Sequence, residues 1–576
     1  MNTNNTSDTI QQKPLRLLPG IIIVILQWLL WLVLPVIFPG DLMAAVGVLG
    51  GMVCGLGVFV WWAFFSGASR IERWGGVVLM IIALVGTSRL VDKSIGTGMQ
   101  GMMFFSYAIP VLCLAFIIWA VVSRNLSERL RQITMILTIL VACGIWFLFR
   151  SDGITGLAGA DFTWRWAPTA EERLLAQTGD EKLAFPSAIE VSVTEAAWPG
   201  FRGSNRDGVV SGLQIKTDWS QSPPVELWRR PIGPGCSSCA IRGNLLYTQE
   251  QRGEDEIVSC YNLKTGDPIW RHSNKARFWD SHAGAGPRST PTLSDSCVYT
   301  LGATGILNAL NAYDGTLIWS HNVVSDTDAK HSGWAFTGSP LVVDDVVIVA
   351  TSGIMAGYDL ATGNNRWIGP DGGLGYSSPH PVTIGGITQV LLMSENGAIS
   401  VAPLDGTVLW KHTWGIERIL QPALIAEGDF LFNDGGLTGM RRISVKKESN
   451  DWAIKEIWTS KQLKPNFNDF VVHKGHAYGF NGPSLACIDI ENGERKWRGG
   501  RYGGQIILLA DQDLLLVLSE KGELALVSAT PDQFKELTSI QAINGKTWNH
   551  PSLAGEILVV RNTEEMAAFQ LPLMNE

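Results

Sequence analysis

The stretch LNAYDGTLIW, residues Leu310–Trp319, decides the fold because its pattern recurs along the chain. Each copy has an apolar segment, a turn containing Asp-Gly, Thr-Gly or Asn-Gly, and a tryptophan four residues after the glycine. These dipeptides supply the positive φ angles that tight β-hairpins need. The full copies end at Trp270, Trp319, Trp367, Trp410 and Trp497. Each copy is therefore predicted to be a hairpin whose tryptophan packs between neighbouring sheets.

The spacing of these tryptophans predicts the size of the repeating unit. A degenerate copy ends at Trp458, an unpaired one carries Trp228, and the copy at Val527–Leu537 lacks the tryptophan. Successive tryptophans from Trp228 to Trp497 lie 39 to 49 residues apart, which matches the length of a four-stranded propeller blade. A second repeat of small polar residues and proline, such as Ser289–Thr292, precedes each unit. Its eight copies predict eight innermost strands around a central axis.

The two ends of the repeat region complement each other. The C-terminus supplies three predicted strands, around 549–552, 556–561 and 566–571, and no tryptophan strand follows them. The orphan strand Val225–Arg230, with Trp228, can complete that sheet and remove the open edge of the ring. The sequence therefore predicts an all-β eight-bladed propeller over residues 224–571.

The first quarter of the chain differs from the rest in charge and hydropathy. Residues 1–150 hold ten Lys/Arg and five Asp/Glu, whereas the remaining 426 residues hold 35 and 48. Five apolar segments are predicted to span a membrane, at about 18–38, 42–65, 76–90, 102–122 and 133–149. Seven basic residues flank the spans on the side of the N-terminus and four on the other, which favours a cytoplasmic N-terminus.

These counts predict the order of domains. Residues 1–17 form a cytoplasmic tail, 18–150 an α-helical transmembrane domain, and 151–223 an extracytoplasmic linker with a short helix near 168–175, which Thr169 and Glu172 cap. The propeller is then expected outside the cytoplasm, in the periplasm or beyond, on a protein of the inner membrane. If the third segment did not cross, the propeller would be cytoplasmic. The acidic outer part has no basic run, so a nucleic-acid partner is excluded.

The repeat Leu-x-Thr-Gly-x-x-x-Trp, as at Leu360–Trp367, resembles that of the pyrroloquinoline quinone (PQQ)-like propellers. That superfamily contains quinoprotein dehydrogenases and the propeller lipoprotein of the outer-membrane assembly machinery. The resemblance covers about residues 198–571 and implies the fold rather than one activity. About five spans before such a propeller also resemble the membrane-bound quinoprotein glucose dehydrogenases. Against an enzyme, the ring has few insertions, and the adjacent cysteines of many alcohol-oxidising members are absent.

The loops before the innermost strands hold the candidate site, because ligands of propellers bind where these loops converge. If a quinone binds, Arg288 is expected to pair with a cofactor carboxylate and Trp334 or Trp548 to stack on its ring. Asn468 and Asp469 are the candidate ligands for Ca²⁺ or Mg²⁺, and Asp469 is also the candidate catalytic base. His282, Tyr376, Asn549 and His550 lie in the same loops. The alternative is that these polar residues only hydrogen-bond around a wet axis.

Cys236 and Cys239 form a Cys-x-x-Cys pair at the start of the first inner strand. Outside the cytoplasm a structural disulfide between them is expected, with buried thiols as the alternative. Redox work of the thioredoxin type is disfavoured, because no helix is predicted after the pair.

Two functions follow. The first is a membrane-anchored platform that binds membrane lipid through its helices and envelope proteins or a polymer through its propeller. The second is a PQQ-dependent dehydrogenase that oxidises a sugar or alcohol and passes electrons to membrane quinone. A sensor is a third reading, for which the sequence offers no cytoplasmic output domain.

Overall fold

The computed structural model describes residues 15–37, 41–155, 159–177, 195–331, 333–414, 421–434, 439–449, 451–465, 467–468 and 470–574. The chain divides into two compact units, residues Met1–Ala167 and Pro168–Glu576.

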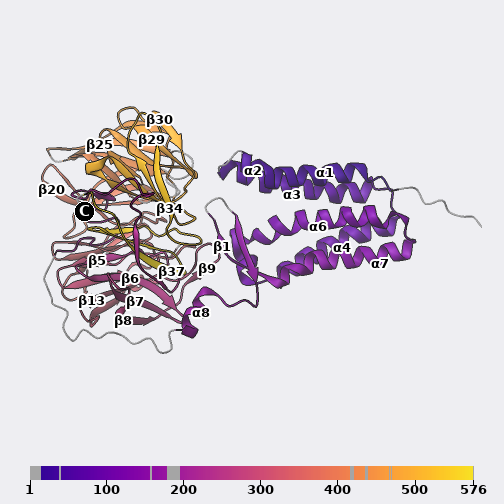
Figure 1. Cartoon of the computed structure of the whole chain (residues 1–576), viewed down its shortest axis with the longest axis horizontal. Helices are drawn as coiled ribbons and strands as arrows, with labels where there is room; N and C mark the ends of the chain where they lie inside the picture. The colour runs from indigo at the N-terminus through magenta and orange to yellow at the C-terminus, as the bar shows by residue number, and fades with distance from the viewer. Residues whose placement is uncertain are drawn as a thin grey trace, which may run out of the picture. The chain divides into compact units, whose positions relative to one another are not determined.

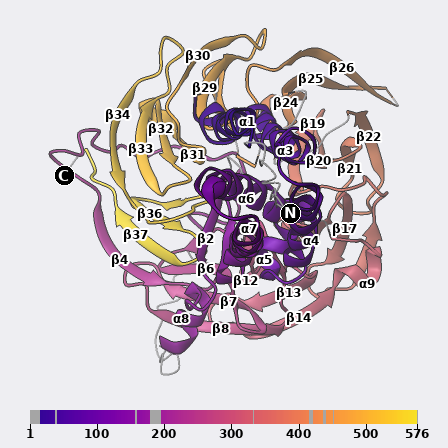
Figure 2. The same ribbon diagram turned by 90° about the vertical axis from the view of Figure 1, so that its right-hand side faces the viewer.

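The first unit is a helical bundle, seen end-on in Figure 2. Five helical stretches are long and apolar enough to cross a membrane: Leu18–Ile37, Ala45–Phe64, Arg70–Ser88, Met103–Asn125 and Glu128–Leu148. The five predicted spans are thereby confirmed as candidates. The elements are α1 (Leu18–Trp28), η1 (Leu29–Val33), α2 (Leu34–Ile37), α3 (Asp41–Phe64), α4 (Arg70–Ser88), α5 (Lys93–Thr97), η2 (Gly98–Gly101), α6 (Met103–Val122), η3 (Ser123–Asn125), α7 (Glu128–Gly144) and η4 (Ile145–Leu148).

The third span begins six residues earlier than the hydropathy pattern predicts, and local capping is the reason. The Ser69 side chain accepts a hydrogen bond from the Glu72 amide while the Glu72 carboxylate accepts one from the Ser69 amide, which forms a capping box. Glu72 also forms a buried ion pair with Arg131 of α7 at 2.6 Å. The extra turn brings α4 to full spanning length, and the ion pair ties it to α7.

A hairpin ends the first unit. Strand β1 (Phe149–Ile154) pairs antiparallel with β2 (Ala160–Trp164) directly after η4. The predicted linker therefore contains a folded hairpin, and its predicted helix is observed as α8 (Ala170–Gln177), which belongs to the second unit.

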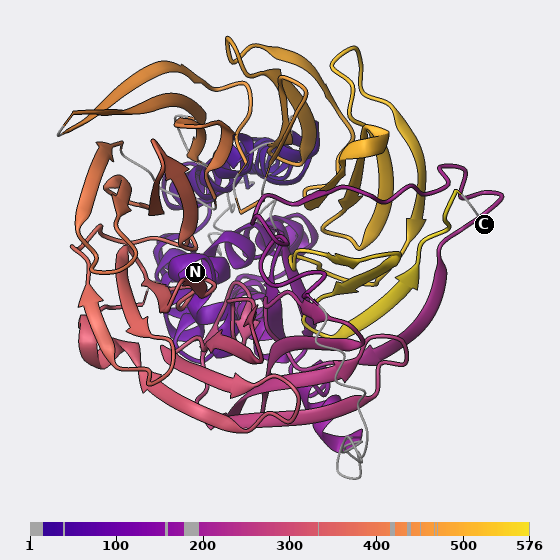
Figure 3. The ribbon, with the colours of Figure 1, turned by 90° about the vertical axis from the view of Figure 1, so that its left-hand side faces the viewer.

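The second unit is an eight-bladed β-propeller, whose blades surround a central axis (Figures 1 and 3). Blade 1 contains β5–β8, blade 2 β11–β14, blade 3 β15–β18, blade 4 β19–β22, blade 5 β23–β26, blade 6 β27–β30, blade 7 β31–β34 and blade 8 β35–β37 with β4. The strands in this order are Ala240–Arg242, Leu245–Arg252, Asp255–Asn262, Pro268–Lys275; Thr292–Ser294, Cys297–Leu301, Ile306–Asn311, Leu317–Asn322; Leu341–Val343, Val346–Thr351, Ile354–Asp359, Asn365–Ile368; His380–Ile384, Ile387–Ser394, Gly397–Val401, Val408–Thr413; Ala423–Ala426, Asp429–Asp434, Gly439–Glu448, Asp451–Ser460; Val471–His473, His476–Asn481, Ser484–Asp489, Arg495–Gly499; Gln505–Leu509, Leu514–Leu518, Glu523–Ser528, Glu536–Gln541; and Ser552–Ala554, Ile557–Arg561, Glu565–Gln570 with β4 (Val225–Pro231).

Short elements lie between the blades. They are β9 (Trp279–Asp280) paired with β10 (Gly284–Ala285), and α9 (Val323–Thr327), whereas η6 (Ala510–Gln512) lies within blade 7 between β31 and β32. Strand β3 (Val209–Val210) pairs parallel with β31 and extends blade 7. The segment before residue 224 thus contributes to the propeller.

The ring closes as the sequence predicts. Strand β37 pairs antiparallel with β4, from Glu565 opposite Pro231 to Gln570 opposite Val225. Arg561, which is 1% exposed, strengthens this closure by donating to the carbonyl oxygens of Gln249 in the first blade and of Gly233 and Gly235 in the segment between β4 and β5. Strands from the two ends of the unit therefore form one sheet and leave no open seam there.

Most of the recurring tryptophans dock their blade on the next one. The Trp270 indole N–H donates to the Ala312 carbonyl oxygen of the following blade at 3.1 Å, and its ring lies on Gly315. Gly315 has φ +73°, and a Cβ there would lie 2.4 Å from the ring, so only glycine fits. The same bond joins Trp228 to Leu263, Trp319 to Leu360, Trp367 to Pro403, Trp458 to Ile490 and Trp497 to Thr530. The predicted packing of tryptophan between sheets is confirmed.

The second repeat links the blades near the axis. The Ser238 amide donates to the Thr290 hydroxyl at 3.2 Å, the Thr290 amide to the Ser339 hydroxyl at 2.9 Å, and the Ser339 amide to the Ser378 hydroxyl at 2.9 Å. Small hydroxyl residues recur here because each must satisfy the backbone of its neighbour in a crowded, buried position.

Candidate functional site

Five aromatic rings converge at one end of the propeller channel, and we call this set the mouth: His282, Trp334, Tyr376, Phe467 and Trp548. Each ring precedes the first strand of a different blade. Ring centroids lie 5.1 Å apart for His282–Trp334, 5.3 Å for Trp334–Phe467, 6.0 Å for Trp334–Trp548 and 5.9 Å for Tyr376–Phe467. Trp334 enters blade 3, whereas Phe467 and Trp548 enter blades 6 and 8, so the rings meet across the axis. The loops before the first strands of these five blades therefore lie together.

Polar groups hold the mouth rings in place. The Trp548 indole N–H donates to the Glu520 carboxylate at 2.7 Å, and the Lys546 ammonium lies 4.4 Å from the Trp548 ring centroid. Lys546 also donates to the His282 carbonyl oxygen at 3.1 Å. Phe467 remains 36% exposed and the other four rings are half-buried. The mouth is thus a firmly held surface whose aromatic faces reach solvent.

Arg288 follows His282 of the mouth in the chain, and its guanidinium is engaged with other groups of the protein. Its guanidinium forms an ion pair with Asp280 at 2.6 Å and donates to the Gly284 carbonyl oxygen at 2.7 Å. Burial would raise the pKa of Asp280, but the hydrogen bond with His282 and the Arg288 charge bring it below its ordinary value. Arg288 therefore orders the loop between β9 and β10, and its predicted role toward a cofactor carboxylate has no support in this geometry.

A buried carboxyl group lies beside this cluster. Glu256 on β7 is 4% exposed, and its carboxylate accepts a hydrogen bond from the Ala303 amide at 2.8 Å. Burial raises the pKa of Glu256 to about 7, although the Ala303 bond and the Arg288 charge oppose this shift. Ala303 in turn accepts a backbone bond from Phe336, two residues after Trp334. Sequence reasoning missed Glu256, because only the fold places it between two blades.

The two cysteines of the Cys-x-x-Cys pair are free and lie in different surroundings. The Cys236 sulfur lies 3.6 Å from an Arg288 nitrogen, whereas the Cys239 sulfur lies 3.9 Å from the Met566 sulfur in blade 8. Burial raises the pKa of Cys239 to about 11. The expected disulfide is not formed in this structure, because the two side chains face neighbouring blades on opposite sides of the segment.

The residues expected to hold PQQ and a divalent cation have protein partners in this structure. The Trp334 and Trp548 rings contact each other at 6.0 Å between centroids. The Asn468 amide nitrogen donates to the Gly504 carbonyl oxygen at 2.6 Å, and Asp469 lies outside the described residues. Among the residues that the structure describes, no group of three or more His, Cys, Asp or Glu side chains is arranged to hold a metal ion.

The other end of the channel is filled by residues 195–210, which we call the strap. Trp198 pairs with Ile241 of β5, and β3 lies beside β31. Arg206, which is 5% exposed, donates to the carbonyl oxygens of Ser339, Pro340 and Pro379, and so joins blades 3 and 4. Burial lowers the pKa of Arg206 to about 10.

Two buried histidines lie beside the strap. His550 stacks on Trp198 at 6.4 Å between ring centroids. Burial first, and the charges of Arg206 and Arg202 second, lower the pKa of His380 to about 3, and burial and Arg202 do the same for His550. Both rings are therefore neutral at physiological pH. The sequence predicts the strap only as a turn-rich segment that covers the next domain.

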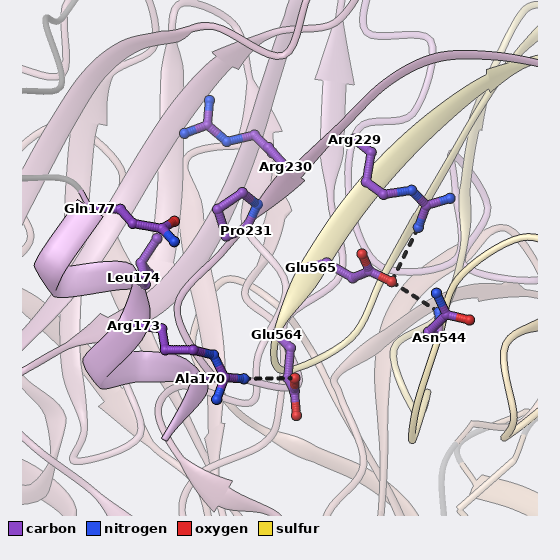
Figure 4. A pocket seen from close by; sticks show the side chains of 10 residues that line it. All are labelled: Ala170, Arg173, Leu174, Gln177, Arg229, Arg230, Pro231, Asn544, Glu564 and Glu565. Atoms are coloured by element: carbon purple, nitrogen blue, oxygen red, sulfur yellow. Dashed lines mark hydrogen bonds and ion pairs between the residues drawn. The ribbon is translucent and has the colours of Figure 1, made fainter. Parts of the chain in front are cut away.

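A pocket of about 490 Å³ lies at the rim of blade 8 beside α8 (Figure 4). Four of the charged side chains that line it form two ion pairs, Arg229 with Glu565 at 3.1 Å and Arg173 with Glu564 at 3.7 Å. On the other side of α8, Glu171 forms an ion pair with Arg277 at 2.8 Å. These contacts fasten α8 to the propeller.

Comparison with known proteins agrees with the repeat. Residues 254–423 match the family model described as outer membrane protein assembly factor BamB. The outer membrane protein assembly factor BamB of Yersinia pestis is 24% identical over 364 residues, which cover 59% of this chain and 80% of that protein.

Two solved structures share the propeller with low identity. The structure of BamB from Moraxella catarrhalis is 14% identical, with a TM-score of 0.44, and covers 60% of this chain and 98% of its own. The quinohemoprotein alcohol dehydrogenase from Comamonas testosteroni is 12% identical, with a TM-score of 0.49, and covers 70% and 83%. The match of residues 254–423 to the family model shows that the chain carries the PQQ-like repeat that the motif predicts.

Proposed function

We propose that this protein is a membrane-anchored platform of the cell envelope, whose propeller binds a protein partner through the mouth. The observation that carries the proposal is the set of five partly buried aromatic rings from five blades, of which Phe467 is 36% exposed. Tryptophan and tyrosine dominate the binding energy of protein interfaces, because large rings bury much apolar area at little entropic cost. The curated relative from Yersinia pestis, of which the alignment covers 80%, bears the name of an assembly factor.

The proposed location is outside the cytoplasm. Seven Lys/Arg flank the spans on the N-terminal side and four on the other, and five crossings then carry residues after Arg150 to the outer side. Protease treatment of spheroplasts tests this orientation. Cleavage within the propeller while a cytoplasmic marker stays intact supports it, and full protection of the propeller contradicts it.

Photo-cross-linking in cells tests the mouth as the binding site. We would replace Tyr376 with p-benzoylphenylalanine in the full chain, with a matched replacement of Ile318, which is 49% exposed on the outer strand β14. The proposal predicts a discrete protein adduct from position 376 that position 318 does not give. Equal adducts from both positions, or none from 376, would contradict it.

The alternative is a PQQ-dependent dehydrogenase, which the family resemblance supports and the mouth geometry opposes. Titration of the full chain with PQQ and Ca²⁺, followed by absorbance and by dye reduction with sugars and alcohols, separates the two. The platform predicts no saturable binding. Saturable binding that Trp334→Ala abolishes would establish the enzyme instead.

A further inference from the structure

Three aromatic rings form a continuous stack in the hairpin that ends the first unit. Phe149 and Trp164 stack at 4.8 Å between centroids with an interplanar angle of 19°, and Trp164 and Trp166 at 5.0 Å with 18°. Trp164 is 48% exposed and Trp166 is 68% exposed. Large apolar rings with this exposure indicate a contact surface when they lie together.

The hairpin is held firmly, so the exposure of the rings does not come from a loose chain end. The Ser151 amide donates to the Ser94 hydroxyl at 2.8 Å, and the Ala160 amide donates to the Tyr107 hydroxyl at 3.0 Å. The Phe162 ring meets the Tyr107 ring edge-on at 4.9 Å. The hairpin therefore lies in a fixed position on α5 and α6.

The two faces of the hairpin differ in polarity. Phe149 lies opposite Trp164, and the two rings belong to one face of the hairpin. Arg150 lies opposite Thr163 on the other face. The Arg150 guanidinium donates to the Thr163 hydroxyl at 3.1 Å and to Asp152 at 3.1 Å. Because side chains alternate along a strand, one face is aromatic and the other charged.

The position of the hairpin relative to the last candidate span is fixed by the chain. The fifth candidate span ends at Leu148, and β1 begins at the next residue. Ile145 and Leu148, at the end of that span, are 42% and 41% exposed and apolar. The stack therefore begins one residue after an exposed, apolar helix end, which is where a spanning helix would leave the hydrocarbon core.

We propose that Trp164 and Trp166 dock into the headgroup region of the membrane that the helices cross. Indole rings favour this layer, because their flat apolar body and polar N–H suit a boundary between hydrocarbon and water. The neighbouring ion pair of Arg165 with Asp92, at 3.6 Å, is partly exposed, as charges at this level must be. The hairpin then fixes the level at which the chain leaves the membrane, before α8 and the propeller begin.

Photo-cross-linking in lipid nanodiscs tests this surface in the full chain. We would place p-benzoylphenylalanine at Trp166, at Asp161 on the polar face, and at Leu137, which is 55% exposed on α7. The proposal predicts a phospholipid adduct by mass spectrometry at 166 and 137 and none at 161. A cross-link from position 166 to the propeller or to a second chain would overturn the proposal. A lipid adduct at position 137 without one at position 166 would overturn it as well. Absence of lipid at 137 would overturn it too, by removing the fifth span.

Quenching by lipids gives an independent readout that needs no cross-linker. Lipids brominated near the top of the acyl chain should quench wild-type fluorescence more than that of the Trp164→Phe/Trp166→Phe variant. Lipids brominated near the chain end should not distinguish the two. Equal quenching of both proteins by the first lipid would contradict the proposal.

Discussion

The strap and the mouth close the same channel in opposite chemical ways. At the strap, Arg206 is 5% exposed and its donors bind backbone carbonyl oxygens of two blades. At the mouth, rings from five blades touch one another while Phe467 remains 36% exposed. A buried cation whose N–H groups are hydrogen-bonded holds the blades together. Partly exposed rings in fixed positions instead offer apolar surface that a partner can bury. One end of the channel is therefore structural, and the other is available for recognition.

The largest expected effect is at the strap. Arg206→Met keeps the bulk of the side chain but leaves the carbonyl oxygens of Ser339 and Pro379 buried without the Arg206 donor, while Pro340 keeps only the hydrogen bond from the Thr292 hydroxyl. We expect a loss of about 3–5 kcal/mol in the stability of the propeller, since each orphaned acceptor costs about 1–3 kcal/mol. Thermal unfolding of the full chain in detergent measures this. Arg498→Met on the surface is the control, with a change of at most about 0.5 kcal/mol.

The second prediction concerns Glu256, whose effect on the stability of the protein should depend on pH. The pKa of Glu256 is raised to about 7, so its contribution to stability is full below its ordinary pKa and is lost as pH rises through 7. Glu256→Gln should therefore stabilise the protein at pH 8 by up to about 3 kcal/mol and have little effect at pH 5. Unfolding temperatures at both pH values test this, with exposed Glu254→Gln as control. Equal shifts at pH 5 and 8 would contradict it.

The smallest expected effect is at a tryptophan remote from both ends. Trp452 lies on β26 of blade 5, where the Lys447 ammonium covers its ring at 4.9 Å. Trp452→Ala should leave the yield of the mouth adduct unchanged within about 20%, because the ring is not part of the mouth. A strong loss of adduct would mean that the partner binds the rim of the propeller rather than its axis.

The sequence predicted the propeller well because its repeats encode local and neighbour contacts. Where a blade has the glycine turn and the tryptophan, these two features define how it docks on its neighbour. The strand Val225–Arg230 has no other strands of its own blade next to it in the sequence, which indicates that it pairs with the C-terminal strands. Trp410 shows the limit of this logic. Its indole N–H donates to Gln389 within its own blade at 2.8 Å, since the next blade has ten-residue strands instead of the glycine turn.

The candidate site was predicted only in part. The loops that carry Trp334 and Trp548 were identified, because their place before each first strand follows from the repeat. The bonding partners of the site side chains were not predicted. The Arg288–Asp280 ion pair and the ring contacts of Trp334 depend on distances that the repeat pattern does not specify. Glu256 and Arg206 acquire their roles from burial, which a repeat pattern does not specify.

The most direct test of the contrast between the two ends is the affinity of the partner that cross-links to Tyr376. Its dissociation constant should be measured for the wild-type chain and for the Trp334→Ala/Trp548→Ala variant in nanodiscs, beside their unfolding temperatures. The account predicts at least about 30-fold weaker binding, equivalent to about 2 kcal/mol, with a much smaller loss of stability than Arg206→Met causes. Unchanged affinity in the double variant would contradict it.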